Sequence, residues 1–253
     1  GLSGGSAETT AGKLEGIVRR RQGIGQDRRA NRCSCAECEL NRLLMIALEF
    51  APVQTTGAFR SNDFARHLPA SGIVPMVLSI DPEHGSRIFN APRNEALLEG
   101  LSDVAIRRLV PDRIARPESR IGQYLRLLTS LDDGFNRRFR ASLDEQLGLL
   151  PSGAVDAVYV SAPPFGAAQL GIDAARKLGV PLILDMRDAW SEWGMAPYTT
   201  YLHYRAALSL ERMAFQNASA VITVTQALRD TFIRTHPYVP EKKFYVVPNG
   251  FDG

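Results

Sequence analysis

The sequence predicts an α/β fold in which a doubly wound, mostly parallel sheet is covered by helices on both faces. Short continuous runs of Val, Ile and Leu recur from residue 43 onward, and longer stretches with helical spacing separate them. Most of these runs are followed by loops that are polar, aromatic or rich in Gly and Pro. Continuous apolar strands that alternate with helices are typical of parallel sheets buried on both faces.

Seven apolar runs are the predicted strands, and they span residues 43–49, 74–80, 104–110, 155–162, 181–186, 220–225 and 244–248. Helices are expected between them, near residues 59–71, 120–148, 165–178, 200–217 and 226–235. Right-handed crossovers between such strands produce a Rossmann-like domain. We therefore assign residues 43–253 to one domain of this kind.

Residues 1–42 differ from the rest of the chain, because they are rich in Gly, Ser and Arg and show little apolar periodicity. This segment carries the whole formal net charge of +3. We predict a flexible basic tail, and charge confined to a tail gives little support for nucleic-acid binding. Its thiols, Cys33, Cys35 and Cys38, have no nearby fourth ligand, so we expect no metal site.

The predicted location is the cytoplasm, since no apolar run approaches the ~18–20 residues of a membrane span and no signal-peptide core is visible. Residues 120–150 combine helical apolar spacing with several arginines. We interpret this stretch as a helix packed on the sheet. The alternative is peripheral contact with the anionic inner face of the plasma membrane.

The segment 182-LILDMRDAWSEW-193 changes abruptly from apolar to charged at the end of a predicted strand. Ligands of parallel sheets bind beyond the carboxyl ends of the strands, so this segment is expected on the rim of a cleft. Arg187 is a candidate to bind a phosphate or carboxylate, and Asp188 to accept a proton from a ligand hydroxyl. The alternative is that Arg187 and Asp188 simply pair. Asp185 is predicted to cap the following turn. Trp190 either stacks on a ligand or anchors the loop.

Four segments carry a family resemblance, and they are residues 44–79, 156–190, 211–232 and 246–252. They include the turn 68-LPASG-72, the loop 161-SAPPF-165, the cluster 185-DMRDAW-190 and the stretch 246-VVPNGFD-252. In this order they resemble the amino-terminal domain of a family 4 glycosyltransferase with the GT-B fold. The resemblance implies a nucleotide sugar as co-substrate, no other cofactor, and a glycan or lipid-linked acceptor.

The resemblance also implies site residues. Gly57 and Ala58 would place helix-start N–H groups against the donor phosphate, and Arg60 would add charge. The alternatives are that Gly57 only permits a tight turn and that Arg60 is solvated. Relatives often have two adjacent glycines here, whereas this chain has Thr56-Gly57. The implied acceptor-binding residues are Pro164, Phe165, Trp190, Thr225 and Asn249.

We therefore expect a glycosyltransferase that retains the configuration of the transferred sugar. The chain stops at 247-VPNGFDG-253, which in the resembled family closes the amino-terminal, acceptor-side domain. The donor domain is expected to be absent, and this half to be inactive alone. One rival is a non-catalytic module that binds a glycan or nucleotide. A dinucleotide-binding protein is disfavoured, because no G-x-G-x-x-G follows the first strand.

Overall fold

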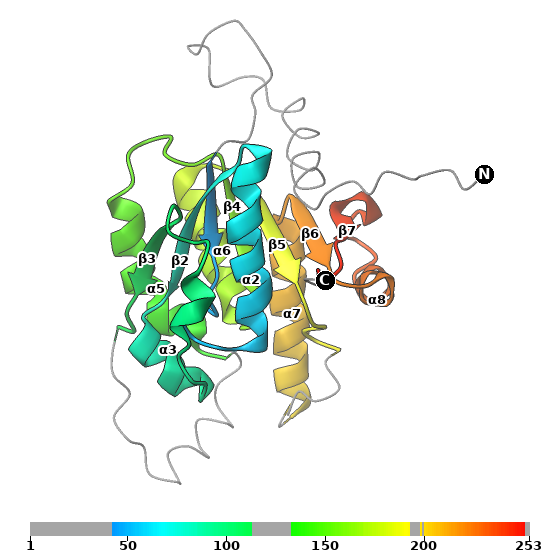
Figure 1. Cartoon of the computed structure of the whole chain (residues 1–253). Coiled ribbons are helices and arrows are strands. Elements are labelled where there is room, and N and C mark those ends of the chain that lie inside the picture. Colours follow the sequence, from blue (N-terminus) through cyan, green and yellow to red (C-terminus); the bar gives the residue numbers. More distant parts are fainter. Residues whose placement is uncertain (1–41, 113–132, 193–197, 199, 251–253) are drawn as a thin grey trace, which may run out of the picture.

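The computed structural model describes residues 42–112, 133–192, 198 and 200–250 (Figure 1). The strands within these ranges form one seven-stranded sheet in the order β3-β2-β1-β4-β5-β6-β7, and all neighbouring pairs are parallel. The predicted fold class is confirmed. The strands are β1 (Arg42–Ile46), β2 (Val74–Ile80), β3 (Ala105–Leu109), β4 (Ala157–Ala162), β5 (Leu182–Met186), β6 (Ala220–Thr223) and β7 (Phe244–Val246).

The helices of the described ranges lie between the strands along the chain, as predicted. They are α2 (Thr56–His67), α3 (Pro82–Phe89), α5 (Phe135–Gly148), α6 (Gly166–Leu178), α7 (Tyr201–Asn217) and α8 (Gln226–Thr235), with 3-10 turns η2 (Leu68–Ser71), η3 (Glu95–Leu98) and η4 (Glu241–Lys243). The sequence prediction missed α3. Its signals are Asp81, whose carboxylate accepts from the Glu83 and His84 N–H groups, and Pro82 at the first helical position.

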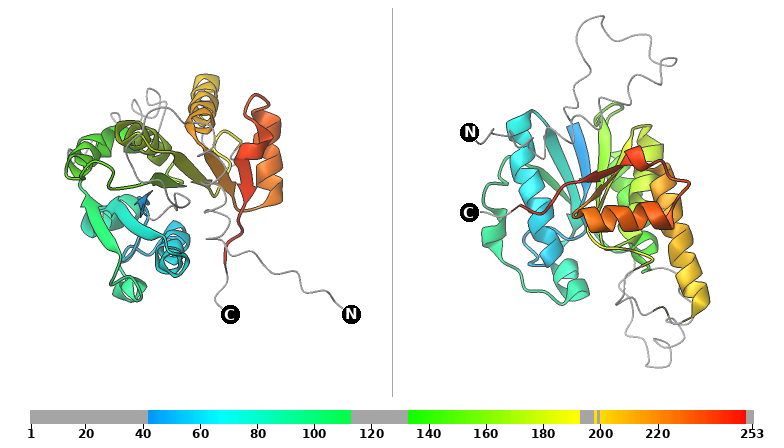
Figure 2. Two further views of the ribbon diagram at one scale, coloured as in Figure 1. Left: turned by 90° about the horizontal axis from the view of Figure 1, so that it is seen from above. Right: turned by 90° about the vertical axis from the view of Figure 1, so that its right-hand side faces the viewer.

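The helices form two layers around the sheet (Figure 2). On one face, α2 and η2 cover an apolar cluster that includes Phe64, Leu68 and Tyr159. The Phe64 and Tyr159 rings meet edge to face at 5.6 Å between centroids. On the other face, α5, α6, α7 and α8 cover a second cluster that contains most of the remaining core. Both faces of the central strands β1, β4, β5 and β6 are therefore buried, which explains why these strands are almost entirely apolar, whereas the edge strand β3 is only partly buried and contains Arg107 and Arg108.

Helix α5 buries Phe139, Leu143 and Leu147 against the sheet. The packing interpretation of residues 120–148 thus holds for 135–148, while residues 120–132 lie outside the described ranges. No helix in the described ranges is both long and apolar enough to cross a membrane. Of the predicted tail, only Arg42 is described, and it begins β1. The three cysteines lie outside these ranges.

The direction of winding reverses between β1 and β4. The chain runs outward from β1 to β2 and β3, then returns to β4 beside β1 and proceeds to β5, β6 and β7. The loops that leave β1 and β4 consequently diverge to opposite faces of the sheet. In doubly wound folds this switch point is where ligands bind.

Helix α6 lies close to β4 because Gly171 has no side chain. A Cβ added there would overlap with a methyl group of Val160 and lie 3.2 Å from Leu182 Cδ1. Neither neighbour is the far end of a long flexible side chain. Gly171 therefore sets the distance between this helix and the centre of the sheet.

Replacing this glycine tests the close packing. We expect Gly171→Ala to lower the free energy of unfolding by about 1–3 kcal/mol, because the added methyl group overpacks the core. Gly148→Ala is the matched control, since a Cβ there meets no atom within 4 Å. It should be neutral or stabilising by up to about 1 kcal/mol. Urea denaturation measures both, and equal effects would contradict the packing argument.

Candidate functional site

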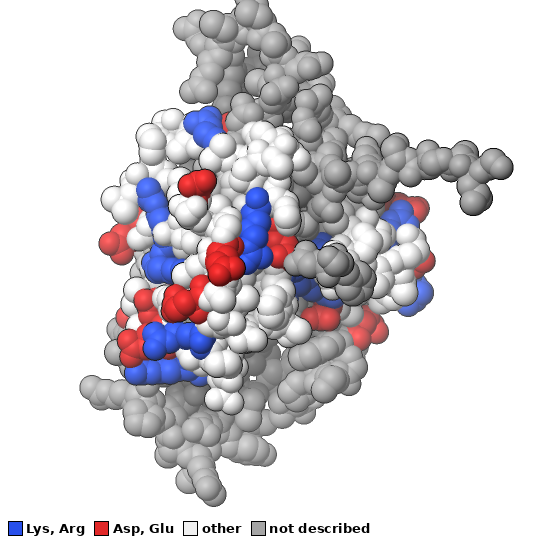
Figure 3. Space-filling model, in the orientation of Figure 1, with Lys and Arg blue, Asp and Glu red and all other residues white. Residues whose placement is uncertain are grey.

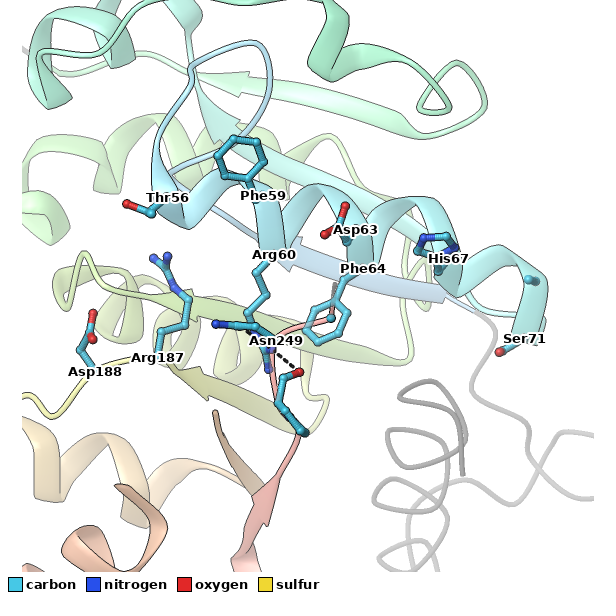
Figure 4. A pocket seen from close by; sticks show the side chains of 13 residues that line it. Thr56, Phe59, Arg60, Asp63, Phe64, His67, Ser71, Arg187, Asp188 and Asn249 are labelled. Atoms are coloured by element: carbon cyan, nitrogen blue, oxygen red, sulfur yellow. Dashed lines mark hydrogen bonds between the residues drawn. The ribbon is translucent and has the colours of Figure 1, made fainter. Parts of the chain in front are cut away.

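A pocket of about 770 Å³ lies along α2, between this helix and the segment after β7, with Arg187 and Asp188 at one end (Figure 4). Its described lining residues are Thr56, Phe59, Arg60, Asp63, Phe64, His67, Ala70, Ser71, Arg187, Asp188, Pro248, Asn249 and Gly250. The pocket thus collects residues from the loops after β5 and β7 and from one face of α2. Four residues that the sequence singled out line it: Arg60, Arg187, Asp188 and Asn249.

The start of α2 is one wall of this end of the pocket. Thr55 caps the helix, and its Oγ1 accepts a hydrogen bond of 3.1 Å from the Ala58 N–H. The Thr56 and Gly57 N–H groups have no partner among the described residues. The first turn of α2 contains no acidic residue. A helix start of this kind carries partial positive charge and free donors, and both favour an anion.

The Arg187 guanidinium packs directly on Gly57. A Cβ at Gly57 would overlap with the guanidinium nitrogens and lie 2.7 Å from Arg187 Cζ. Gly57 lies in the first turn of α2 and shows no left-handed backbone angle, so its role here is to leave space. In Figure 4 the Arg187 side chain points from the end of β5 toward Thr56. The structure therefore joins a full positive charge to the helix start.

Arg187 is held by two groups that the sequence analysis did not identify. Its Nη2 donates to Glu49 Oε1 at 3.1 Å and, in a very short contact, to the Pro163 carbonyl oxygen. Glu49 is the last residue of a predicted apolar strand, and its partner Arg187 lies 138 positions away in the sequence. Its one sequence signal is that it is the first charged residue after β1. Local pattern does not show which residue it meets.

Arg60 lies deeper and has every donor occupied. Nε donates to Asp185 Oδ2 at 2.7 Å, and Nη2 donates to Asp185 Oδ1 at 2.9 Å and to the Val247 carbonyl at 3.0 Å. Nη1 donates to the Pro248 carbonyl at 3.1 Å and to Asn249 Oδ1 at 3.0 Å. A guanidinium has five N–H groups, so none remains for a phosphate. We therefore replace the predicted phosphate contact of Arg60 with a structural role.

Asp185 does not cap the following turn. Its side chain is fully buried and accepts hydrogen bonds from Arg60 and, at 2.6 Å, from the Tyr159 hydroxyl. Burial and the neighbouring carboxylate raise the pKa of Tyr159 well above its ordinary value, so this hydroxyl remains a donor. The correction for Asp185 follows from register, because it faces α2 from within β5 and pairs with Ser161 of β4.

Ala58 is also unavailable to a ligand, since its N–H is already bonded to Thr55. Of the predicted phosphate loop, the Gly57 N–H remains without a partner among the described residues, and the neighbouring Thr56 N–H, which was not predicted, is equally unpaired there. Asp188 is exposed and has no hydrogen-bond or ion-pair partner among the described residues, so the predicted pairing alternative with Arg187 does not occur. Its predicted role as a proton acceptor stays a prediction.

The aromatic rim residues pack on each other. The Phe165 and Trp190 rings are stacked with centroids 5.0 Å apart, and Trp190 is only 7% exposed. The backbone N–H of Trp190 donates to Glu211 Oε1 at 3.1 Å. Of the two interpretations of Trp190, the structure shows the anchor. Pro164 is buried, while Phe165 is partly exposed and neither lines the described pocket.

Glu211 on α7 is a buried anchor that the sequence analysis missed. Besides Trp190 it accepts from the Ser191 N–H at 3.3 Å and from the Ser191 hydroxyl, and it lies 2.8 Å from His236 Nε2. Both Glu211 and His236 are 1% exposed. The loop after β5 is therefore tied to α7 and to the end of α8. Thr225 serves as the cap of α8 and lies outside the described pocket lining.

Comparison with known families and structures identifies the fold and the family. A family model of the glycosyl transferase 4-like domain matches residues 56–250. The chain belongs to this family. Among curated proteins, no sequence matches the chain significantly.

Solved structures of similar fold include three proteins. Arabidopsis thaliana UGT89C1 complexed with quercetin aligns with 84% of this chain and 52% of its own, at 14% identity and a TM-score of 0.50. Anabaena Alr3699/HepE in complex with UDP aligns with 84% of this chain and 45% of its own, at 14% identity and a TM-score of 0.48. Sucrose-phosphate synthase from Thermosynechococcus elongatus aligns with 84% of this chain and 49% of its own, at 15% identity and a TM-score of 0.47. The chain thus spans about half the length of these proteins.

Among the described residues, positive charge is not concentrated over the face that carries α2 (Figure 3). On the face that carries α2, basic and acidic side chains are interspersed among the residues drawn in colour (Figure 3). Arg187 with the start of α2 is therefore a local feature, distinct from a broad basic surface. No cluster of metal-ligating side chains exists within the described ranges.

The buried pair is the first feature to test. The Arg60 and Asp185 side chains are 6% and 0% exposed. We expect Arg60→Met to lower the free energy of unfolding by about 3–5 kcal/mol, because it leaves a buried carboxylate unpaired. In Arg42→Met, which breaks a half-exposed pair with Asp156, the loss should be under about 1 kcal/mol. Chemical denaturation distinguishes them, and similar losses would refute the structural role of Arg60.

Proposed function

We propose that this chain is the acceptor-side half of a nucleotide-sugar-dependent glycosyltransferase. In this proposal the enzyme moves a sugar from a nucleotide diphosphate donor to a glycan or lipid-linked acceptor and retains its configuration. One observation carries it: in a member of this family, a free helix start and a partly buried arginine meet beside a pocket at the switch point of the sheet. Such a site matches a diphosphate.

The chemistry of glycosyl transfer explains why this site would be useful. When the bond between sugar and diphosphate breaks, negative charge develops on the leaving phosphate. Donors fixed in advance near that position stabilise the charge without having to reorganise. In this chain the Thr56 and Gly57 N–H groups and the Arg187 guanidinium are such donors. Asp188, exposed on the same rim, would orient the acceptor or accept its proton.

Two further parts of the proposal concern partners and location. The solved structures of similar fold are each about twice as long as the aligned region, which supports a donor-side domain outside this chain. We propose that this half binds the diphosphate group but does not turn over a nucleotide sugar by itself. We also propose that the enzyme works in the cytoplasm. The alternative is a non-catalytic module that binds a glycan or nucleotide with the same fold.

Gly57→Ala tests the diphosphate site. The added methyl group must displace the Arg187 guanidinium, which is the flexible end of a long side chain, so the fold should tolerate it. We expect binding of inorganic pyrophosphate, measured by isothermal titration calorimetry at low salt, to weaken about tenfold or more. The melting temperature should change little.

Gly148→Ala is the matched control for that experiment, because it adds the same methyl group to a helix far from the pocket. It should leave pyrophosphate binding unchanged. Equal binding by wild type and Gly57→Ala would show that the diphosphate does not lie at the start of α2.

A turnover assay separates a transferase from a binding module. The gene is first read past the codon for Gly253, and its whole product is assayed for transfer from a panel of labelled nucleotide sugars. We expect transfer by the whole product and none by the 253-residue chain. Turnover by the chain alone would contradict its assignment as a half-enzyme, and binding without transfer by the whole product would favour the module.

A further inference from the structure

We propose that Glu49 is a positioning residue, which together with the Pro163 carbonyl holds the Arg187 guanidinium on Gly57 and directs Nη1 into the pocket. This inference rests on the proposed function and adds to it a residue for which neither motif nor comparison predicts a role. It concerns how the anion-binding arginine is oriented, and not which sugar or acceptor is used.

The donors of Arg187 divide into two sets. Nη2 has two N–H groups, and these are taken by Glu49 Oε1 at 3.1 Å and by the Pro163 carbonyl. Nε is buried without a partner. Nη1 has no partner among the described residues and is not among the buried unpaired atoms. Its two N–H groups therefore remain for a ligand, at the atom nearest to where a Gly57 side chain would be.

This division argues against Glu49 as a stand-in for the ligand. A carboxylate that occupied the ligand position would be expected to bond to Nη1 and to the free N–H groups of Thr56 and Gly57. Glu49 instead bonds to Nη2, on the side of the guanidinium that Pro163 also contacts. It therefore fixes the orientation of the guanidinium and leaves the pocket-facing donors available.

The fold explains why these three groups meet. Glu49 follows β1, Pro163 follows β4 and Arg187 follows β5. Strand β4 pairs with β1 on one side and with β5 on the other. The three loops thus leave adjacent strands at the same edge of the sheet, across the switch point. The arginine spans this edge, and its other neighbour is the start of α2.

Orientation and charge predict opposite effects when Glu49 is removed. The Arg187 and Glu49 side chains are 13% and 15% exposed, so their interaction is only partly screened by solvent. If Glu49 acted only through its negative charge, its removal would strengthen anion binding. If Glu49 positions the guanidinium, its removal frees Arg187 to rotate away from Gly57 and weakens binding. The sign of the change therefore decides between the two roles.

The experiment measures the affinity for inorganic pyrophosphate of wild type, Glu49→Ala and Glu49→Gln at one fixed ionic strength. We expect Glu49→Ala to bind roughly tenfold more weakly. Glu49→Gln keeps an oxygen that accepts from Nη2 and should recover most of the affinity. Thermal unfolding shows that each variant is folded, and Glu49→Gln serves as the test if Glu49→Ala does not fold.

A double-mutant cycle distinguishes positioning from a general loss of structure. In an Arg187→Gln background, Glu49→Ala should cause almost no further loss, because there is no guanidinium left to orient. The matched control is Asp156→Asn, which removes an arginine-paired carboxylate at the opposite edge of the sheet and should leave pyrophosphate binding unchanged.

The outcomes separate this inference from the function on which it rests. If wild type does not bind pyrophosphate, the proposed diphosphate site fails, and the positioning role fails with it. If wild type binds but Glu49→Ala binds equally well or more tightly, only the positioning role is overturned. An equal loss in the wild-type and Arg187→Gln backgrounds would also overturn it, since Glu49 would then act without the arginine.

Discussion

The buried Arg60–Asp185 pair fixes the geometry on which the pocket depends. It joins α2 to β5, and through the remaining donors of Arg60 it also fixes the segment 247–249. A buried ion pair is tolerated only when its hydrogen bonds are satisfied, because desolvation costs several kcal/mol per ion. Here all five N–H groups and both carboxylate oxygens are used. Helix α2 therefore has one position relative to β5, and both walls of the pocket follow from it.

Two arginines at one edge of the sheet thus have different roles because they differ in unused donors. Arg60 is saturated by protein groups and contributes structure, while Nη1 of Arg187 has no partner among the described residues and would contact the ligand in the proposed site. Their carboxylate partners differ in the same way. Asp185 is fully buried and binds the saturated arginine on both oxygens, whereas Glu49 is partly exposed and holds one nitrogen of the other. The two arginines carry the same charge, so it is the number of unoccupied N–H groups on each guanidinium that distinguishes the structural role of Arg60 from the proposed role of Arg187.

The sequence was sufficient for the sheet and for part of the site. Apolar runs located the seven strands of the described residues, since the central strands, which are buried on both faces, must be apolar. Arg187 and Asp188 line the pocket, as expected of charged residues directly after a buried strand. The roles of Arg60 and Glu49 were not predictable, because their partners lie 125 and 138 positions away and depend on strand order. Helix α3 was missed although its capping signals are present in the sequence.

The single glycine at the start of α2 follows from the same geometry. Position 57 faces the Arg187 guanidinium, which fills the space of a missing side chain. Thr56 is exposed, so a side chain is accommodated there. The Arg187 guanidinium thus occupies the space that a side chain at position 57 would need, and it adds a positive charge to the helix start.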